Sequence, residues 1–250
     1  MSSNWFVTPR PPRPPGQVRL FCLPYAGGSS AVFRAWSELC PPQVELVMVE
    51  LPGRGARHGE RLARRVEDIA VPLAEAIAAR AERPFGLFGH SMGGLLAFHV
   101  ARELSRQGAP LPAHLFVSAQ PPAHLGHQGV KRAGLPDAAL RDELVRLGGT
   151  PPEILAHAEL MTLMLPVLRA DFELCETAPA ISGQPLACDL TALGGVADPF
   201  VDANELKDWA QHTERRFSVN LFPGGHFFLH EHRASLLSLV SRRLLESVRP

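Results

Sequence analysis

The sequence predicts an α/β fold in which helices cover both faces of a mostly parallel β-sheet. Short apolar runs rich in β-branched and aromatic residues alternate along the chain with longer helical patterns. This alternation is typical of βαβ units, whose parallel strands are buried on both faces. The chain has 250 residues, of which 46% are hydrophobic and 20% charged. This composition suffices for one domain with a single sizeable core.

The expected strands share an apolar run bounded by glycine, proline or polar residues. They cover residues 18–23, 44–51, 85–88, 115–118, 186–193 and 217–222. The clearest helix is expected over residues 62–82, where apolar residues recur at spacings of four, three, four and four and form one face. These apolar positions are Leu62, Val66, Ile69, Leu73 and Ile77.

Two segments stand apart from this alternation. Residues 1–16 form a proline-rich N-terminal arm, which we expect to be extended before the main domain over residues 17–250. The connection over residues 120–185 is far longer than an ordinary crossover, and its residues 138–147 and 154–174 have amphipathic helical patterns. We therefore expect a helical insertion over about 121–184, above one edge of the sheet. A simply lengthened crossover is the alternative.

Charge and apolar patterning exclude several classes of function. Lys and Arg total 25 and Asp and Glu total 25, so the chain lacks the basic excess that nucleic-acid and membrane-surface binding require. No apolar run is long enough to span a bilayer, and the N-terminus lacks the apolar core of a secretory signal. The four cysteines form no C-x-x-C pair and are expected as buried thiols. We expect a monomeric, cytoplasmic protein without nucleic-acid or membrane partners.

A nucleophile candidate follows the expected strand at residues 85–88. Residues 89–93, Gly-His-Ser-Met-Gly, fit the pattern G-x-S-x-G, and a helix-like run follows them. This strand–turn–helix setting is the one that the motif requires, because the sharp turn lifts the serine hydroxyl clear of the sheet. Gly89 and Gly93 remove side chains that would crowd the turn. The pattern predicts Ser91 as a nucleophile. The alternative is a glycine-rich turn without chemistry.

A serine nucleophile needs a base, and the base needs an orienting carboxylate. Of the 11 histidines, His226 follows the last expected strand in a loop that can return over Ser91. The acid is expected between the last two strands, where Asp198 follows two glycines and precedes a proline. Asp202 is the reserve candidate, although it can also cap a following helix. His226 follows two glycines in a loop rather than a helix, so no metal site is expected, nor any cofactor.

The developing oxyanion of acyl transfer requires two N–H donors. The first expected donor is the backbone N–H of Met92, directly after the nucleophile. The second is expected in the glycine-containing loop over residues 24–30, for which we select Ala26. The alternative for this loop is a simple turn before a helix capped by Ser29 or Ser30.

Taken together, the motifs resemble the stand-alone type II thioesterases of polyketide and nonribosomal peptide assembly lines. The resemblance extends from about residue 18 to residue 243 and includes the segments LFCLPYAGGSS, VELPGRGARHGE, PFGLFGHSMGG, LPVLRADFELCET, ALGGVADP and FPGGHFFL. It implies an α/β-hydrolase fold with a helical lid. It also implies the hydrolysis of acyl or aminoacyl groups from the phosphopantetheine arm of acyl or peptidyl carrier proteins, with editing of stalled or misprimed synthases.

The resemblance assigns Ser91, Asp198 and His226 to the family's catalytic triad and Ala26 and Met92 to its oxyanion hole. One departure is Val196, where the family often has an acidic residue; the triad aspartate is retained. Arg54 and Arg57 are expected as structural arginines on the surface, with contact to the carrier or its phosphate as the alternative.

Spacing alone does not select a thioester, because a Ser-His-Asp triad serves esters, thioesters and some amides. The first alternative is therefore a general cytosolic carboxylesterase, and the second is a non-catalytic binding module with a hydrolase fold. An excised cyclising thioesterase is a third, which the lack of an upstream carrier domain disfavours. Acyl chain length and the cognate carrier are not encoded in these motifs.

Overall fold

A seven-stranded sheet forms the centre of the molecule, with strand order β1-β3-β2-β4-β5-β6-β7. The computed structural model describes residues 5–9 and 16–249. All neighbouring strands are parallel except β1, which pairs antiparallel with β3. The predicted α/β fold with a mostly parallel sheet is therefore confirmed. The strands are β1 (Phe6–Val7), β2 (Val18–Leu23), β3 (Val44–Val49), β4 (Phe85–His90), β5 (His114–Ser118), β6 (Asp189–Gly195) and β7 (Phe217–Phe222).

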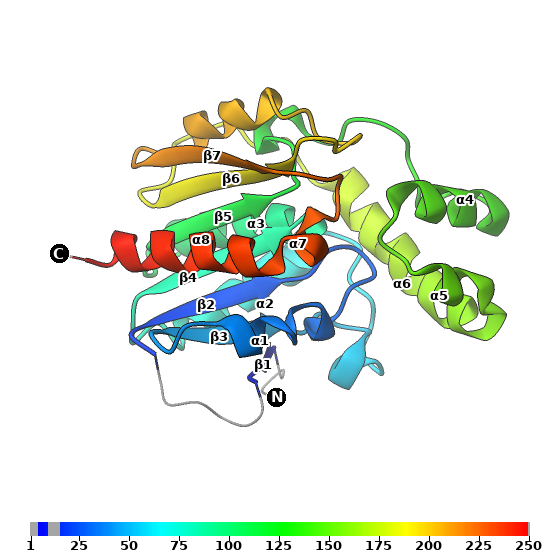
Figure 1. The fold of residues 1–250 in the computed structure, drawn as a ribbon, viewed down its shortest axis with the longest axis horizontal. Helices are drawn as coiled ribbons and strands as arrows, with labels where there is room; N and C mark the ends of the chain where they lie inside the picture. The colour runs from blue at the N-terminus through cyan, green and yellow to red at the C-terminus, as the bar shows by residue number, and fades with distance from the viewer. Residues whose placement is uncertain (1–4, 10–15, 250) are drawn as a thin grey trace.

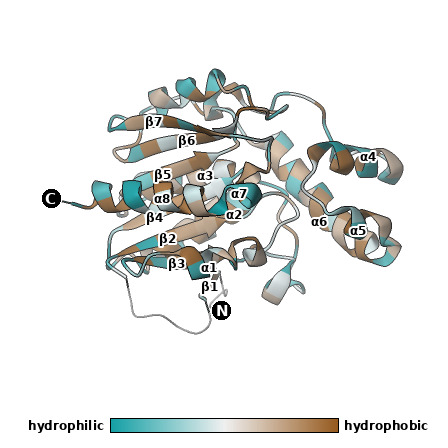
Figure 2. Cartoon of the chain, in the orientation of Figure 1, coloured by the Kyte–Doolittle hydropathy of each residue, from teal (hydrophilic) through white to brown (hydrophobic). Residues whose placement is uncertain are grey.

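Helices cover both faces of the sheet, α1 and α8 on the near side in Figure 1 and α2 and α3 behind it. Each face has its own apolar cluster, and the strands between the two clusters are mostly brown in Figure 2, with some pale and teal positions. The five inner strands β3, β2, β4, β5 and β6 are almost entirely buried. The covering helices are α1 (Trp36–Leu39), α2 (Glu67–Ala78), α3 (Met92–Arg106), α7 (Phe228–Glu231) and α8 (Arg233–Ser247). The 3₁₀-helices of the described residues are η1 (Ser30–Phe33), η2 (Gly55–Arg57), η3 (Ala123–Leu125) and η4 (Glu205–His212).

The chain between β5 and β6 forms a helical unit at one end of the sheet (Figure 1). Its helices are α4 (Asp137–Leu147), α5 (Pro152–Ala156) and α6 (Ala158–Thr177). The helix expected over 154–174 is divided, because the backbone is extended at His157, whose side chain accepts from the N–H of Leu160 and caps α6. The unit has a small apolar cluster of its own around Leu140, Met161 and Leu165.

The order of the strands reverses direction between β2 and β4. The chain runs from β2 to β3 on one side and then crosses to β4 on the other side of β2. In open parallel sheets, ligands bind at such a switch point, beyond the carboxyl ends of the strands. The loops that follow β2 and β4 are the two segments that the sequence assigns to the oxyanion hole and the nucleophile.

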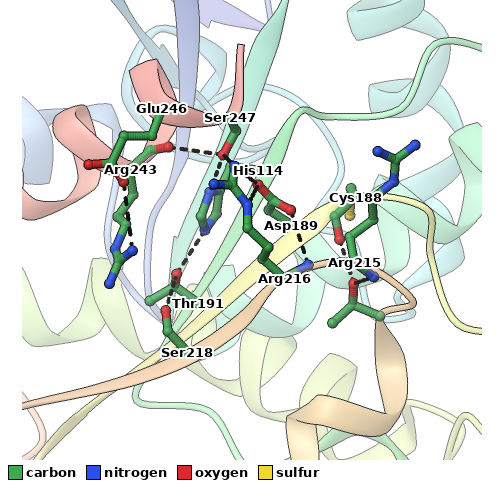
Figure 3. Close-up of polar contacts among 11 residues, drawn as sticks. His114, Cys188, Asp189, Thr191, Arg215, Arg216, Ser218, Arg243, Glu246 and Ser247 are labelled. Atoms are coloured by element: carbon green, nitrogen blue, oxygen red, sulfur yellow. Dashed lines mark hydrogen bonds and ion pairs between the residues drawn. The ribbon is translucent and has the colours of Figure 1, made fainter. Parts of the chain in front are cut away.

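A polar cluster joins the opposite end of the sheet to the last helix (Figure 3). Ser247 of α8 donates to Asp189 Oδ2 at 2.7 Å and lies 2.9 Å from His114 Nδ1. Arg216 donates through Nη2 and Nε to the same carboxylate oxygen, at 2.6 and 3.0 Å. The cluster therefore ties α8 to β5, β6 and the start of β7, far along the strands from the switch point.

Part of the N-terminal arm lies within the described residues. Trp5 is buried at 3% exposure, its carbonyl accepts from the N–H of Glu50, and the two following residues form β1. The remainder of the arm, residues 1–4 and 10–15, lies outside the described residues, so the expected extended conformation there stays a prediction. Within the described ranges, no helix is long and apolar enough to cross a membrane.

Candidate active site

Ser91 lies on a strained turn between β4 and α3. Its backbone adopts φ 53° and ψ −120°, a region that residues other than glycine rarely occupy. The turn leaves no room for side chains at its flanks, since a Cβ added to Gly89 would overlap the carbonyl of Gly93, and one added to Gly93 would overlap that of Leu23. The glycines therefore permit the close packing of β4, α3 and β2 that lifts Ser91 above the sheet.

The structure brings the three residues that the sequence selected into one hydrogen-bonded row. His226 Nε2 lies 3.0 Å from Ser91 Oγ, and His226 Nδ1 lies 2.8 Å from Asp198 Oδ2. Asp198 follows β6 and His226 follows β7, so all three stand at the carboxyl ends of parallel strands. The other carboxylate oxygen of Asp198 accepts from the N–H of Phe200 at 2.9 Å, which fixes its orientation. With Nδ1 donating to the carboxylate, Nε2 can accept the serine proton.

Aromatic rings surround the His226 imidazole. The ring centroids of Phe200, Phe227 and His90 lie 5.5, 5.1 and 5.5 Å from that of His226. His90 is fully buried and contacts Ser118 Oγ through Nδ1 at 2.9 Å. Burial, then repulsion from His226, lowers the pKa of His90 well below the ordinary histidine value. A neutral ring therefore stands beside His226, and it adds no positive charge that would oppose protonation of the base.

The two expected oxyanion donors line the same cavity as Ser91. Met92 is the first residue of α3, so its N–H has no acceptor within the helix and the positive end of the helix dipole lies there. In the loop after β2, Gly27 donates its N–H to Asp171 and Gly28 donates to the carbonyl of Tyr25. This leaves Ala26 as the residue of the loop that faces the cavity beside Ser91. Ser29 caps η1 through its side chain, which accepts from the N–H of Ala31, as the alternative for this loop expected.

A cavity of about 430 Å³ opens over Ser91 and His226. One wall comes from the loops at the end of the sheet, including Phe200. The opposite wall comes from the unit between β5 and β6, including Phe172 and Cys175 of α6. The cavity is thus formed jointly by the sheet and by the insertion, and its apolar and polar lining can accommodate an acyl chain with polar substituents.

The reserve candidate for the acid lies outside the hydrogen-bonded row. Asp202 Oδ1 accepts from the N–H of Asn204 at 2.8 Å in the turn before η4, but the N-cap of that helix is Asn204 and no side chain caps it, so the capping alternative is wrong. Asp189 belongs to the cluster at the opposite end of the sheet (Figure 3). No group of three or more metal-ligating side chains occurs among the residues that the structure describes.

The sequence analysis did not predict the ion pair between Arg54 and Asp171 beside the site, and it misjudged the exposure of two arginines. Arg54 and Arg57 were expected on the surface, but they are 8% and 5% exposed. Arg57 stacks over Trp5 at 4.0 Å and Arg54 pairs with Asp171 of α6. The expectation of surface arginines is therefore wrong, because both are covered by segments distant in sequence. The sequence feature that could have indicated this pair is Asp171, an acidic residue three positions after Leu168 on the apolar face of a predicted helix.

Comparisons with known proteins agree with this geometry. The profile of the thioesterase domain matches residues 18–244. The gramicidin S biosynthesis protein GrsT of Aneurinibacillus migulanus is 36% identical over 97% of this chain and 94% of its own length. Among solved structures, RedJ, a thioesterase from the prodiginine biosynthetic pathway of Streptomyces coelicolor, is 38% identical with a TM-score of 0.87, over 94% of this chain and 95% of its own. The type II thioesterase BorB from the borrelidin biosynthetic cluster is 35% identical with a TM-score of 0.88, over 98% and 99%.

Proposed function

The chain belongs to the thioesterase family of α/β-hydrolase enzymes, and from this premise we propose that it hydrolyses acyl or aminoacyl thioesters on the phosphopantetheine arm of carrier proteins. The kinship with GrsT, RedJ and BorB supports an editing role in polyketide or nonribosomal peptide synthesis. The observation that carries the proposal is the contact of Ser91 Oγ with the Nε2 of His226, inside a chain of this family.

In the proposed acylation step, His226 removes the proton of the Ser91 hydroxyl as the oxygen attacks the thioester carbonyl. The 3.0 Å contact already has the length that this proton transfer requires. Asp198 holds the imidazole with Nδ1 protonated and stabilises the imidazolium that forms. Ser91 then carries the acyl group as an ester.

Negative charge develops on the carbonyl oxygen during this attack. We assign its stabilisation to the N–H groups of Ala26 and Met92, each worth about 2.7–4 kcal/mol of the barrier in comparable sites. The tetrahedral intermediate collapses with departure of the pantetheine sulfur, which takes up the proton held by His226 and leaves readily because a thiol is far more acidic than an alcohol. His226 next activates a water molecule, and the acyl-serine is hydrolysed to the free acid.

The insertion over residues 121–184 acts in this proposal as a lid over the acyl chain, since α6 supplies one wall of the cavity. A single chain supplies Ser91, His226, Asp198 and both donors, so we propose the monomer as the active unit. Because carrier-bound intermediates are cytosolic, we also propose a cytoplasmic location. Elution volume and light scattering of the purified protein measure its oligomeric state directly.

The test compares acyl-carrier thioesters with matched oxygen esters that lack the carrier, and identifies the released acids by mass. A carrier-directed thioesterase gives a higher kcat/KM on the carrier thioester. A general carboxylesterase hydrolyses the small oxygen ester at least as well, and that result would reject the carrier assignment.

Ser91→Ala is the control variant that tests whether Ser91 is the nucleophile. We expect a loss of at least about a thousandfold in kcat, with no acyl-enzyme detectable by mass spectrometry. A burst of acyl-enzyme in Ser91→Ala would show that another residue is the nucleophile. If neither the wild-type protein nor Ser91→Ala turned over any carrier thioester or ester, the alternative of a non-catalytic binding module would be favoured instead.

A further inference from the structure

A buried ion pair joins the insertion to the loop that carries Ala26. Asp171 of α6 is 2% exposed and Arg54, which follows β3, is 8% exposed. The guanidinium donates through Nη1 to Asp171 Oδ2 at 2.6 Å and through Nη2 to Oδ1 at 2.7 Å. This bidentate arrangement fixes the plane of the carboxylate as well as its position.

Both members of the pair also bind the backbone next to Ala26. Gly27 donates its N–H to Asp171 Oδ2 at 2.7 Å, and the carbonyl of Gly28 accepts from Arg54 Nη1 at 3.2 Å. The contact with α6 is close, since Gly27 has φ 75° and a Cβ there would lie 2.6 Å from Leu168 Cδ2. The ion pair therefore holds a donor and an acceptor on two successive residues of the loop.

These bonds determine the direction of the Ala26 N–H. Gly28 donates its own N–H to the carbonyl of Tyr25 at 2.9 Å. That carbonyl and the Ala26 N–H belong to one planar peptide group, so fixing one fixes the other. Asp171 and Arg54 therefore fix the positions of Gly27 and Gly28 through hydrogen bonds. Gly28 in turn fixes the orientation of the Tyr25 carbonyl, and this sets the direction of the Ala26 N–H.

A purely stabilising role explains the pair poorly. Replacing a buried ion pair by apolar residues of similar volume often leaves the stability of a protein unchanged or raises it, because desolvation offsets the Coulomb attraction. What distinguishes this pair is its geometry, because Asp171 Oδ2 accepts hydrogen bonds from both the Arg54 guanidinium and the N–H of Gly27.

We propose that Asp171 is a positioning residue of the oxyanion hole, which aims the Ala26 N–H by accepting the Gly27 N–H while Arg54 orients its carboxylate. The inference rests on the proposed function, since it presupposes that Ala26 stabilises an oxyanion formed at Ser91. It makes α6 part of the machinery that stabilises the transition state, in addition to a wall of the cavity.

The test measures kcat and KM on one acyl-carrier thioester for three variants. For the double variant Arg54→Met/Asp171→Leu, which removes both charges, we expect a folded protein with kcat reduced about ten- to a hundredfold and KM changed less than threefold. Asp171→Asn keeps an oxygen that can accept from Gly27, so it should retain a kcat above that of Asp171→Leu.

A second readout reports the oxyanion hole without turnover. An alkyl boronic acid forms a tetrahedral adduct on a nucleophilic serine and mimics the transition state. Its affinity should fall by the same factor as kcat/KM in each variant. This measurement also covers the case in which the double variant fails to fold, because it can be made on Asp171→Asn alone.

Glu173→Gln is the matched control, because Glu173 lies on the same helix and pairs with Arg64 without touching the loop. We expect wild-type kcat and KM from it. The proposal is overturned if the folded double variant keeps wild-type kcat, if KM rises while kcat stays constant, or if Glu173→Gln loses as much activity. Activity in Ser91→Ala would instead refute the proposed function, so the two failures are distinguishable.

Discussion

Ser91 occupies a backbone conformation that costs about 1–3 kcal/mol, and its neighbours must be small for the turn to exist. The glycines of the turn differ in what surrounds them. Gly93 lies in the first turn of α3 against the end of β2, whereas Gly134 in the loop before α4 has no atom within 4 Å of an added Cβ. The same substitution can therefore be made at a crowded and at an open position of one chain.

For Gly93→Ala we expect the free energy of unfolding to fall by about 3 kcal/mol or more, because the methyl group overlaps the Leu23 carbonyl and α3 must move away from β2. Activity should fall with it, since the same movement displaces Met92. Urea unfolding measures the first effect. Gly134→Ala should change stability by less than about 0.5 kcal/mol. Equal stability of the two variants would contradict the packing described for the turn.

Helix α8 depends on a polar attachment as well as on its apolar face. Its residues Leu236, Leu237, Val240 and Leu244 pack on the sheet, while Ser247 in its last turn reaches Asp189 and His114 (Figure 3). The attachment lies at the end of the sheet opposite to Ser91. Its loss should affect folding and leave the chemistry unaltered.

We expect Ser247→Ala to lower the free energy of unfolding by about 1–2 kcal/mol, because a buried imidazole nitrogen and a carboxylate lose a partner. The kcat on carrier thioesters should remain at the wild-type value. Ser238→Ala, at an exposed position of the same helix, is the control and should stay within about 0.5 kcal/mol of wild type. Similar unfolding midpoints for the two variants would argue against the attachment.

Several buried histidines give the whole protein a sensitivity to acid. Burial lowers the pKa of His99, His114 and His212 to about 4 in each case. In the unfolded chain a histidine titrates near 6.5. Between these pH values the unfolded state binds more protons than the folded state. The contribution of the three histidines to the free energy of unfolding is therefore fully present above about pH 6.5 and is lost as the pH falls toward 4.

We expect the free energy of unfolding to fall by about 3 kcal/mol or more between pH 7.5 and pH 5. Urea unfolding at both pH values measures it. His99→Leu should reduce the difference, since one proton-binding group is removed. His58→Gln, at an exposed position, should leave it unchanged. A stability that is constant over this pH range would contradict the neutral, buried state of these rings.

The boundaries of the elements were predicted less well than their order. The bounds of β2 and β7 agree with the predicted runs, but α2 begins at Glu67 rather than at residue 62 and β6 is shifted toward Asp198. The apolar periodicity marks which face is buried, whereas the hydrogen bonds that end a helix or strand depend on neighbouring segments. The two-residue strand β1 was missed because it is too short for any periodicity and exists through pairing with β3.

Local patterns in the amino-acid string were enough to predict the α/β fold, the helical insertion and the five residues now brought together at the site. This is possible because a nucleophile turn, an acid after one strand and a histidine after the next are each encoded within a few residues. Folding alone determined the burial of Arg54, its pairing with Asp171 117 positions away and the attachment of both to the Ala26 loop. Such contacts depend on which distant segments exclude water from a charge, and no local periodicity records that.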